Sequence, residues 1–455
     1  MTNTDPRATL NAAPMSRLQW IIVILTVALN ALDGFDVMAI SFASPGIAVE
    51  WKTTMAGLGL ILSMELWGMA AGSVVLGGVA DVIGRRPTIL GCLLMMTVGM
   101  LMVTTTNDVV VFSAWRFITG LGIGGMLAAI NAQAAEFSSN KSRALAIALM
   151  SAGYPIGGVV GGLAVTQLLK VFDWRSVFYF GTGMTAVLIP LVFFIMPESV
   201  HWLVRKRPSD ALVRINAIMT RLSQATTAVL PELQAEAKRK AWIDIFSKTM
   251  LATTIIVTVA YFAHIVTFYY ILKWVPKLVV NMGFSPSSAG GVLTWASVGG
   301  AAGCLTFGWL TKHFDLKKLT LFFFVCSWLA TILFGQTTAD LTVLSALVCF
   351  AGYFINSGIV GLYSLIAQVF PTHVRASGTG FAIGVGRGGS VLSPIVAGIL
   401  LQGGMSLGVL SVIMGTGSIL AAAALVWLKW NSSQGAGGSS VTDEKLVAGL
   451  APNRA

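Results

Sequence analysis

Charged side chains are scarce in this chain: only 10% of its 455 residues are Asp, Glu, Lys or Arg, whereas 56% are hydrophobic. An average soluble domain carries about 25% charged residues, so this composition excludes an ordinary water-soluble globule. It also excludes a disordered chain, because disorder requires low hydrophobicity. Cysteine occurs only four times, without metal-ligand spacing, so we expect reduced packing residues and no metal site.

Motifs of common chemistries are also missing. The sequence contains no G-x-x-x-x-G-K-[ST], no H-E-x-x-H and no G-x-S-x-G, which argues against ATP-driven pumping and hydrolysis. We therefore expect no enzyme activity, no catalytic residues and no cofactor. The net charge of +11 is compatible with nucleic acid, but long apolar runs over the whole length indicate a bilayer instead. We expect membrane lipid, and not nucleic acid, as a partner.

Twelve apolar runs are long enough to cross about 30 Å of hydrocarbon, which takes roughly 20 residues. They cover residues 19–44, 57–80, 88–106, 109–132, 143–169, 176–196, 250–272, 285–310, 318–336, 340–365, 375–401 and 405–429. The predicted fold class is an all-α polytopic membrane protein. The first 18 residues are polar and lack a cleavage site, so no removable signal peptide is expected.

A long polar segment divides these spans into two sets of six. The predicted organisation is a cytoplasmic tail, a six-helix bundle, a cytoplasmic linker, a second six-helix bundle and a disordered tail, over residues 1–18, 19–196, 197–249, 250–430 and 431–455. The last tail is rich in Gly and Ser, which is typical of disorder. The basic clusters of the linker are interpreted as a solvated face near anionic lipid.

The distribution of Lys and Arg tests this topology. Of the 29 basic residues, 22 fall on the side of the two termini, five fall on the other side and two lie inside spans. The five are Lys52, Lys170, Arg175, Lys273 and Lys277. This asymmetry follows the positive-inside rule and predicts that both termini are cytoplasmic.

An internal repeat relates the two halves. The loop from Gly77 to Arg86 matches the loop from Gly308 to Lys318 at an offset of 231 residues. Glu136 and Arg143 match Gln368 and Arg375 at an offset of 232. Duplicated halves of this kind place a substrate site near the bilayer midplane, between them.

These motifs resemble the major facilitator superfamily over residues 19–430. The loop Gly77…Asp81…Gly84-Arg85-Arg86 is similar to its signature between the second and third helices, and Arg116-x-x-x-Gly120-x-x-x-Gly124 resembles its second motif. Asp33-Gly34-Phe35-Asp36 is similar to the tetrapeptide of the aromatic acid:proton symporter subfamily. The resemblance implies import of a benzoate-type acid with protons across a bacterial inner membrane. It also implies a proton gradient as the energy source, and we expect a functional monomer.

Ionisable side chains inside hydrocarbon are costly, and each is therefore a functional candidate. Asp33 and Asp36 are three residues apart and share one face of a helix. Two nearby carboxylates cannot both ionise cheaply in a low-dielectric site, so one proton is retained, as coupling requires. Gly34 is interpreted as loosening the helix so that carbonyls approach a ligand. The alternative is that one Asp caps a broken helix and the other pairs with an Arg.

Arg387 lies in the eleventh span among four glycines. Its permanent charge requires an anion, and its planar fork matches a carboxylate. It is predicted to hold the substrate carboxylate, the alternative being a permanent pair with an acid such as Asp36. Arg116 is assigned to proton coupling by the resemblance, or to a tight helix contact. Glu65 is a possible partner of Arg116, and His264 fits hydrogen-bonded packing better than a proton relay.

Two further sets of residues complete the prediction. Aromatic side chains hold a flat carboxylate by stacking, and the chosen pocket residues are Tyr154, Trp295 and Tyr363. A latch that stabilises one gate state is expected in the loops, with topogenic charge as the alternative. Its members are Asp81, Arg85, Arg86, Glu136 and Arg143.

The preferred function is therefore a proton-coupled importer of an aromatic carboxylate. An importer of muconate or a dicarboxylate fits Arg387 equally well. A drug:proton antiporter usually carries Gly-Pro in its fifth helix, which Gly153-Tyr154-Pro155 lacks. A membrane receptor normally carries a signalling domain, for which no segment is long enough.

Overall fold

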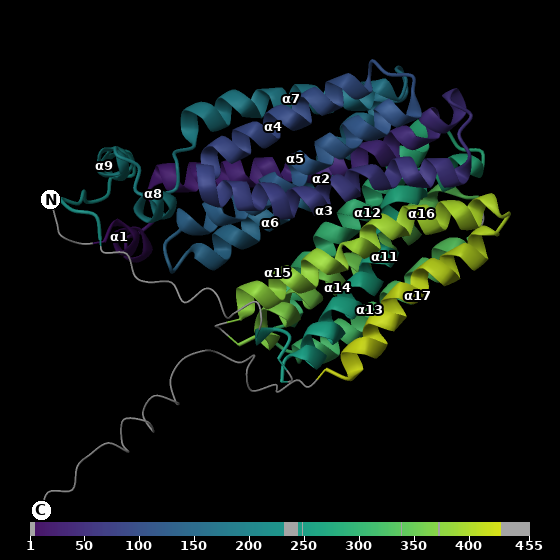
Figure 1. Cartoon of the computed structure of the whole chain (residues 1–455). Helices are drawn as coiled ribbons and strands as arrows, with labels where there is room; N and C mark the ends of the chain where they lie inside the picture. The colour runs from purple at the N-terminus through teal and green to yellow at the C-terminus, as the bar shows by residue number, and fades with distance from the viewer. Residues whose placement is uncertain (1–4, 232–243, 248, 338, 372–373, 429–455) are drawn as a thin grey trace, which may run out of the picture.

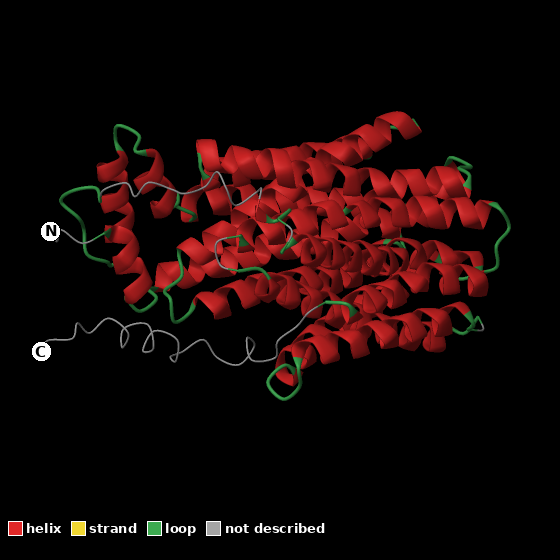
Figure 2. Ribbon diagram, turned by 60° about the horizontal axis from the view of Figure 1, so that its bottom comes forward, coloured by secondary structure: helices red, strands yellow, loops and turns green. Residues whose placement is uncertain are grey.

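The computed structural model describes residues 5–231, 244–247, 249–337, 339–371 and 374–428. Over these residues the regular structure is helical (Figure 2). Twelve helices are long and apolar enough to cross a membrane, which confirms the predicted fold class. The predicted disordered tail 431–455 lies outside the described residues.

The N-terminal half starts with the short helix α1 (Pro6–Ala12) and continues with six long helices. These are α2 (Arg17–Glu50), α3 (Met55–Ile83), α4 (Arg85–Val103), α5 (Val109–Glu136), α6 (Arg143–Leu168) and α7 (Arg175–Ile195). Two short helices, α8 (Val200–Lys206) and α9 (Ala211–Arg221), follow within the predicted linker.

The C-terminal half has six spans made of seven helices. These are α11 (Leu251–Asn281), α12 (Pro286–Leu310), α13 (Leu316–Gly335), α14 (Leu341–Val369), α15 (Arg375–Gly386), α16 (Gly388–Gln402) and α17 (Leu407–Val426). The eleventh predicted span consists of α15 and α16, which meet at Arg387.

The seventh span is longer than predicted, because α11 continues to Asn281 instead of ending near residue 272. Apolar residues such as Trp274 and Val279 extend the buried face. Lys273 and Lys277, which the charge distribution assigned to an outer loop, therefore lie within this helix and are 0% and 7% exposed.

Several of the few acidic residues serve as helix caps. Asp108 accepts hydrogen bonds from the backbone N–H groups of Val110 and Val111, at 2.9 and 2.8 Å, where α5 begins. Asp315 and Asp340 cap α13 and α14 in the same way. A carboxylate at this position satisfies N–H groups that have no partner within the helix. These acids thus have a local structural role.

Glycines let α3 and α5 cross at close range. Gly120 and Gly124 of α5 lie so near the backbone carbonyls of Glu65 and Met69 that a β-carbon at either position would collide with α3. Small residues allow such close helix packing in membranes. The glycines of the motif that begins at Arg116 therefore form a helix contact. This contact places Arg116 close to Glu65.

The same crossing occurs in the C-terminal half. Gly299 and Gly303 of α12 pack against the backbone of α14 as Gly68 and Gly72 of α3 pack against α5. These two pairs of glycines are related by the offset of 231 that relates Gly77 to Gly308. The repeat seen in the loops thus extends into the helix packing.

The two halves lie side by side in Figure 1, with α1, α8 and α9 at one end of the molecule, which we call the terminal face. The halves contact each other through α3 with α16, α6 with α12 and α2 with α11. Near the opposite end, the distal face, the backbone N–H of Ala56 donates to the side chain of Gln402 at 3.1 Å. In contrast, α15 packs mainly on α11 and α14 of its own half. The halves are therefore joined most closely towards the distal face.

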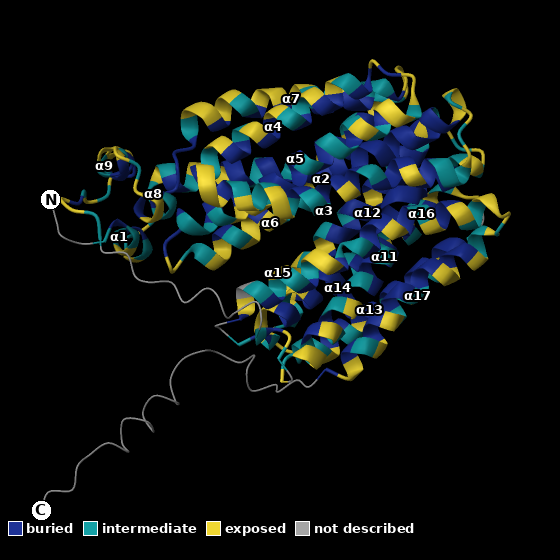
Figure 3. Ribbon diagram, viewed as in Figure 1, coloured by how far each residue is buried: buried dark blue, intermediate teal, exposed yellow. Residues whose placement is uncertain are grey.

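Burial follows this arrangement. The helices α2 and α11 have the largest buried shares of the twelve spans (Figure 3), and they contact each other across the boundary between the halves. Large apolar side chains remain exposed in both halves, for example Val74, Leu163, Leu305 and Leu420. An apolar exterior matches lipid, so the polar groups inside the boundary are the ones that require explanation.

Candidate functional site

The acidic pair lies at the centre of α2. Asp33 and Asp36 are 1% and 0% exposed, and none of their carboxylate oxygens has a hydrogen-bond partner among the described residues. The helix is unbroken at this point, so neither residue caps a helix end. Gly34 packs against the backbone carbonyl of Tyr154 in α6, so the idea that it opens the helix to a ligand is wrong. A helix contact is the reason for a glycine here.

Arg387 lies where α15 gives way to α16. Its guanidinium interacts electrostatically with Asp33 of the other half, and its Nη1 has no hydrogen-bond partner among the described residues. It makes no ion pair within the described part of the chain, so the alternative of a permanent pair with Asp36 is not seen here. The predicted acid and base thus interact across the boundary, and the cation has no carboxylate ion-pair partner among the described residues.

Phenol groups surround Arg387. Its charge interacts with Tyr261, Tyr269 and Tyr363, and the hydroxyl oxygens of Tyr261 and Tyr363 lie 3.0 Å apart. Tyr261 is buried, whereas Tyr363 is 39% exposed. Hydroxyl groups beside a guanidinium offer further hydrogen bonds to an anion bound there. Tyr363 was predicted as a site residue, Tyr261 was a candidate aromatic that was not chosen for the pocket, and Tyr269 was missed.

Arg116 is fully buried and pairs with Glu65. Its Nη2 lies 2.6 Å from Oε1 of Glu65 and donates to the backbone carbonyl of Asp36 at 3.2 Å. The guanidinium also lies over the ring of Phe178, 5.3 Å from its centroid. Buried charges require such partners. Arg116 is thereby fixed against the helix that carries the acidic pair.

Lys273 of α11 is one of the two lysines that the sequence analysis assigned to an outer loop. Its Nζ lies 3.2 Å from Oε2 of Glu65 and also donates to the backbone carbonyl of Val37. Both partners belong to the N-terminal half, so Lys273 connects the halves. The apolar residues that continue beyond it along α11 were the signal for this position.

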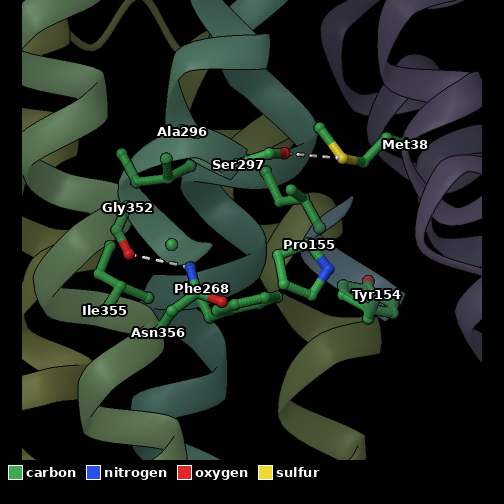
Figure 4. A pocket seen from close by; sticks show the side chains of 12 residues that line it. Met38, Tyr154, Pro155, Phe268, Ala296, Ser297, Gly352, Ile355 and Asn356 are labelled. Atoms are coloured by element: carbon green, nitrogen blue, oxygen red, sulfur yellow. Dashed lines mark hydrogen bonds between the residues drawn. The ribbon is translucent and has the colours of Figure 1, made fainter. Parts of the chain in front are cut away.

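A small cavity lies between the halves (Figure 4). It is lined from both sides, with Met38 and Tyr154 facing Phe268, Ser297 and Asn356. Its volume of about 30 Å³ corresponds to about one water molecule. An aromatic acid therefore requires a wider opening than the structure has in this state.

The three predicted pocket aromatics have different places. Tyr154 lines the cavity, and Tyr363 lies beside Arg387 instead. Trp295 is not among the lining residues and is 49% exposed. Its neighbours Ala296 and Ser297 line the cavity, because successive helical residues point in different directions. The choice of Trp295 therefore has no support from its position.

The predicted latch forms a network at the terminal face. Arg85 lies 2.7 Å from Asp81 and 3.5 Å from Glu136, and Glu136 accepts a hydrogen bond from Ser199. Arg143 does not join these ion pairs. It donates instead to the carbonyl of Ala135, at the end of α5.

Glu198 was missed by the sequence analysis but occupies the centre of this region. Its Oε1 accepts from the backbone N–H groups of Arg85 and Ser199, each at 2.8 Å. Burial raises the pKa of Glu198, although these hydrogen bonds oppose the shift. Arg86 donates to the carbonyl of Phe193 at 2.5 Å. All of these groups belong to the N-terminal half and its linker.

His264 has a packing environment in α11. Its Nδ1 lies 2.9 Å from Oγ of Ser418 and its Nε2 lies 3.0 Å from the carbonyl of Ile355. Its ring lies 4.3 Å from that of Phe324. Both ring nitrogens are thus occupied inside the C-terminal bundle. Among the described residues no group of three or more His, Cys, Asp or Glu is placed to hold a metal ion.

Comparison with known proteins identifies the family to which the chain belongs. The model of the Major Facilitator Superfamily matches residues 26–338 and 258–451. A 4-hydroxybenzoate transporter of Pseudomonas aeruginosa is 30% identical over 87% of this chain and 89% of its own length. A benzoate transport protein of Acinetobacter baylyi is 25% identical over 85% and 84%.

A solved structure shares the fold. The xylose transporter of E. coli in its inward-open conformation superimposes with a TM-score of 0.72 at 16% identity, covering 90% of this chain and 96% of its own. The chain belongs to the Major Facilitator Superfamily, and within it to the family of these aromatic-acid transporters, so it is a membrane transporter and not an enzyme.

Proposed function

We propose that the protein imports an aromatic carboxylate together with a proton across the inner membrane of a bacterium. One observation carries this proposal: Asp33 and Asp36 are buried without hydrogen-bond partners in the described chain, and Asp33 interacts electrostatically with Arg387, a cation of the other half that has no ion-pair partner among the described residues. The names of the relatives support a benzoate-type acid as the substrate class.

The balance of buried charge supports coupling to protons. Three acids and three bases interact at the centre, namely Asp33, Asp36, Glu65, Arg116, Lys273 and Arg387. When all six are charged, their sum is zero. A carboxylate that enters this site adds one negative charge, which is expensive in low dielectric unless a proton accompanies it. The unpartnered acids Asp33 and Asp36 are the groups able to take that proton.

The same geometry supports Arg387 as the carboxylate receptor. Arginine keeps its charge in proteins, and its fork donates two parallel hydrogen bonds to a carboxylate. The phenols of Tyr261 and Tyr363 add polar contacts. The ring of the acid is then held by aromatic side chains, of which Tyr154 lines the cavity between the halves.

The transport cycle follows from alternating exposure of this site. We assign the terminal face to the cytoplasm because most Lys and Arg fall on that side. The state described here, joined towards the distal face, then corresponds to release into the cell. When the carrier opens to the outside, a proton binds at Asp33 or Asp36 and the carboxylate binds Arg387. The halves then rock, and both are released inside.

The charged network at the terminal face is assigned to gating. Asp81, Arg85 and Glu136 are bound to one another within the N-terminal half. Closing the terminal face brings α15 towards this network, so its charges are placed to select between the two states. Arg86 and Arg143 stabilise the backbone around it.

The test is uptake of labelled benzoate, 4-hydroxybenzoate and a muconate-type dicarboxylate into cells that express the protein. We expect uptake of an aromatic monocarboxylate that a protonophore abolishes. Uptake of the dicarboxylate alone would replace the proposed substrate class. Uptake that is indifferent to the protonophore would reject proton coupling.

A further inference from the structure

The contact between Glu65 and Lys273 has a property that other ion pairs in the described chain lack. It joins the two halves, because Glu65 lies on α3 and Lys273 on α11. Both side chains are 0% exposed. Other ion pairs of the described spans lie within one half, as those of Arg116 with Glu65 and of Arg175 with Glu50 do. A buried pair between two bodies must be made and broken when those bodies move.

Glu65 serves two cations at once. One carboxylate oxygen lies 2.6 Å from Arg116 of its own half, and the other lies 3.2 Å from Lys273 of the opposite half. If the halves separate here, Glu65 keeps its ion pair with Arg116, because both residues belong to the N-terminal half. Lys273 loses both Glu65 and the carbonyl of Val37, and its ammonium becomes hydrated in the opening.

The surroundings place this pair in the closed side of the transporter. Six residues from Glu65 along α3, towards the distal face, Gly59 packs against the carbonyl of Pro394, which also accepts from Trp274 at 3.3 Å. At the rim, Ala56 donates to Gln402. Separating the halves at the distal face therefore requires the Glu65–Lys273 pair to part.

We propose that Lys273 is a positioning residue for transport, which fastens the distal face through Glu65 and so sets the balance between the two open forms. This inference rests on the proposed function only in that the halves alternate. It does not depend on which acid is carried. The pair supplies an electrostatic fastening in the closed form, and water replaces it in the open form.

The experiment measures closure without any substrate. The four native cysteines are replaced by serine, and Ala56→Cys and Gln402→Cys are introduced at the distal rim. A short bifunctional thiol reagent then cross-links the halves when this face is closed. The variants compared are Lys273→Met, Lys273→Arg and Lys277→Met. Lys277 is a matched control, because it is buried one turn further along α11 and has no ion pair among the described residues.

Lys273→Met is expected to lower the cross-linking rate at least about fivefold, the range of ordinary coupling between two states. Lys273→Arg keeps the charge and is expected to restore most of the rate. Lys277→Met is expected to match the parent protein. Equal rates in Lys273→Met and the parent would overturn the proposal, as would an equal loss in Lys277→Met.

A second comparison guards against a simple folding defect. Glu65→Gln leaves Arg116 and Lys273 buried together without a carboxylate, and we expect low yield of folded protein. Adding Lys273→Met removes one of these cations and is expected to raise that yield. A double variant no better than Glu65→Gln would contradict the shared role of Glu65. Failure of the wild type to take up aromatic acids would reject the proposed function and leave the cross-linking result standing.

Discussion

The two halves of the molecule share their helix packing but differ in the charged residues that lie at equivalent positions. The offsets of 231 and 232 that relate their loops also relate the glycine crossings of α3 with α5 and of α12 with α14. At the first crossing lie the charged residues Glu65 and Arg116. The equivalent positions in the second are Ala296 and Val348, both apolar and buried. Close packing therefore does not require the ion pair.

The first helices of the halves differ in the same way. Shifting Asp33 and Asp36 by 231 leads to His264 and Thr267. The C-terminal pair is fully hydrogen-bonded inside its bundle, whereas the N-terminal carboxyl groups have no partner in the described chain. The C-terminal half supplies Lys273 and Arg387 across the boundary instead. Acids in one half thus face cations from the other, so the site exists only when both halves meet.

The largest loss of stability is expected when Glu65 is replaced by the residue that stands at the equivalent position of the C-terminal half. Glu65→Ala, which mimics Ala296, leaves Arg116 and Lys273 buried without a carboxylate. Removing one partner of a buried pair costs about 3–5 kcal/mol. Thermal unfolding of the purified protein measures this loss. A change below about 1 kcal/mol would mean that water compensates these cations.

Because the two helix crossings are packed alike, alanine substitutions at equivalent glycines are expected to lower the stability equally. Gly120→Ala and Gly352→Ala each place a β-carbon against a backbone carbonyl of the neighbouring helix. Overpacking of this kind costs about 1–3 kcal/mol. Melting temperatures of the two variants should therefore fall together. A loss confined to one half would show that the two crossings are not equivalent.

Arg387→Lys tests whether the C-terminal half supplies the group that binds the substrate carboxylate. The ammonium keeps the charge but loses the second parallel hydrogen bond to a carboxylate, which is worth about 1.5 kcal/mol or more. We expect KM for an aromatic acid to rise about tenfold, with little change in kcat. Initial uptake rates over a range of substrate concentration separate the two constants. A variant with lowered kcat and normal KM would remove Arg387 from substrate binding.

The smallest effect is expected at His264, the counterpart of Asp33. His264→Asn perturbs two buried hydrogen bonds and is expected to cost about 1 kcal/mol of stability. Uptake and its dependence on pH should remain as in the wild type. A shifted pH profile would show that His264 takes part in coupling.

The span count followed from the sequence because the length of an apolar run is a local property. The residues Asp33, Arg116 and Arg387 stood out because charge is costly in lipid. Glu65 was named as a possible partner of Arg116, and the structure confirms this pair, but the sequence alone could not decide it because the pair depends on how closely α3 and α5 cross. Lys273 was missed because a lysine at the end of an apolar run resembles a loop residue.

Coupling through the acids of α2 is tested most directly in proteoliposomes with an imposed pH gradient. The wild type should accumulate a labelled aromatic acid when the lumen is alkaline, and a protonophore should abolish this accumulation. Asp36→Asn should lose accumulation but keep exchange of labelled for unlabelled acid, because Arg387 still binds the carboxylate. Gradient-driven accumulation by Asp36→Asn at the wild-type level would contradict a proton-carrying role for this carboxyl group.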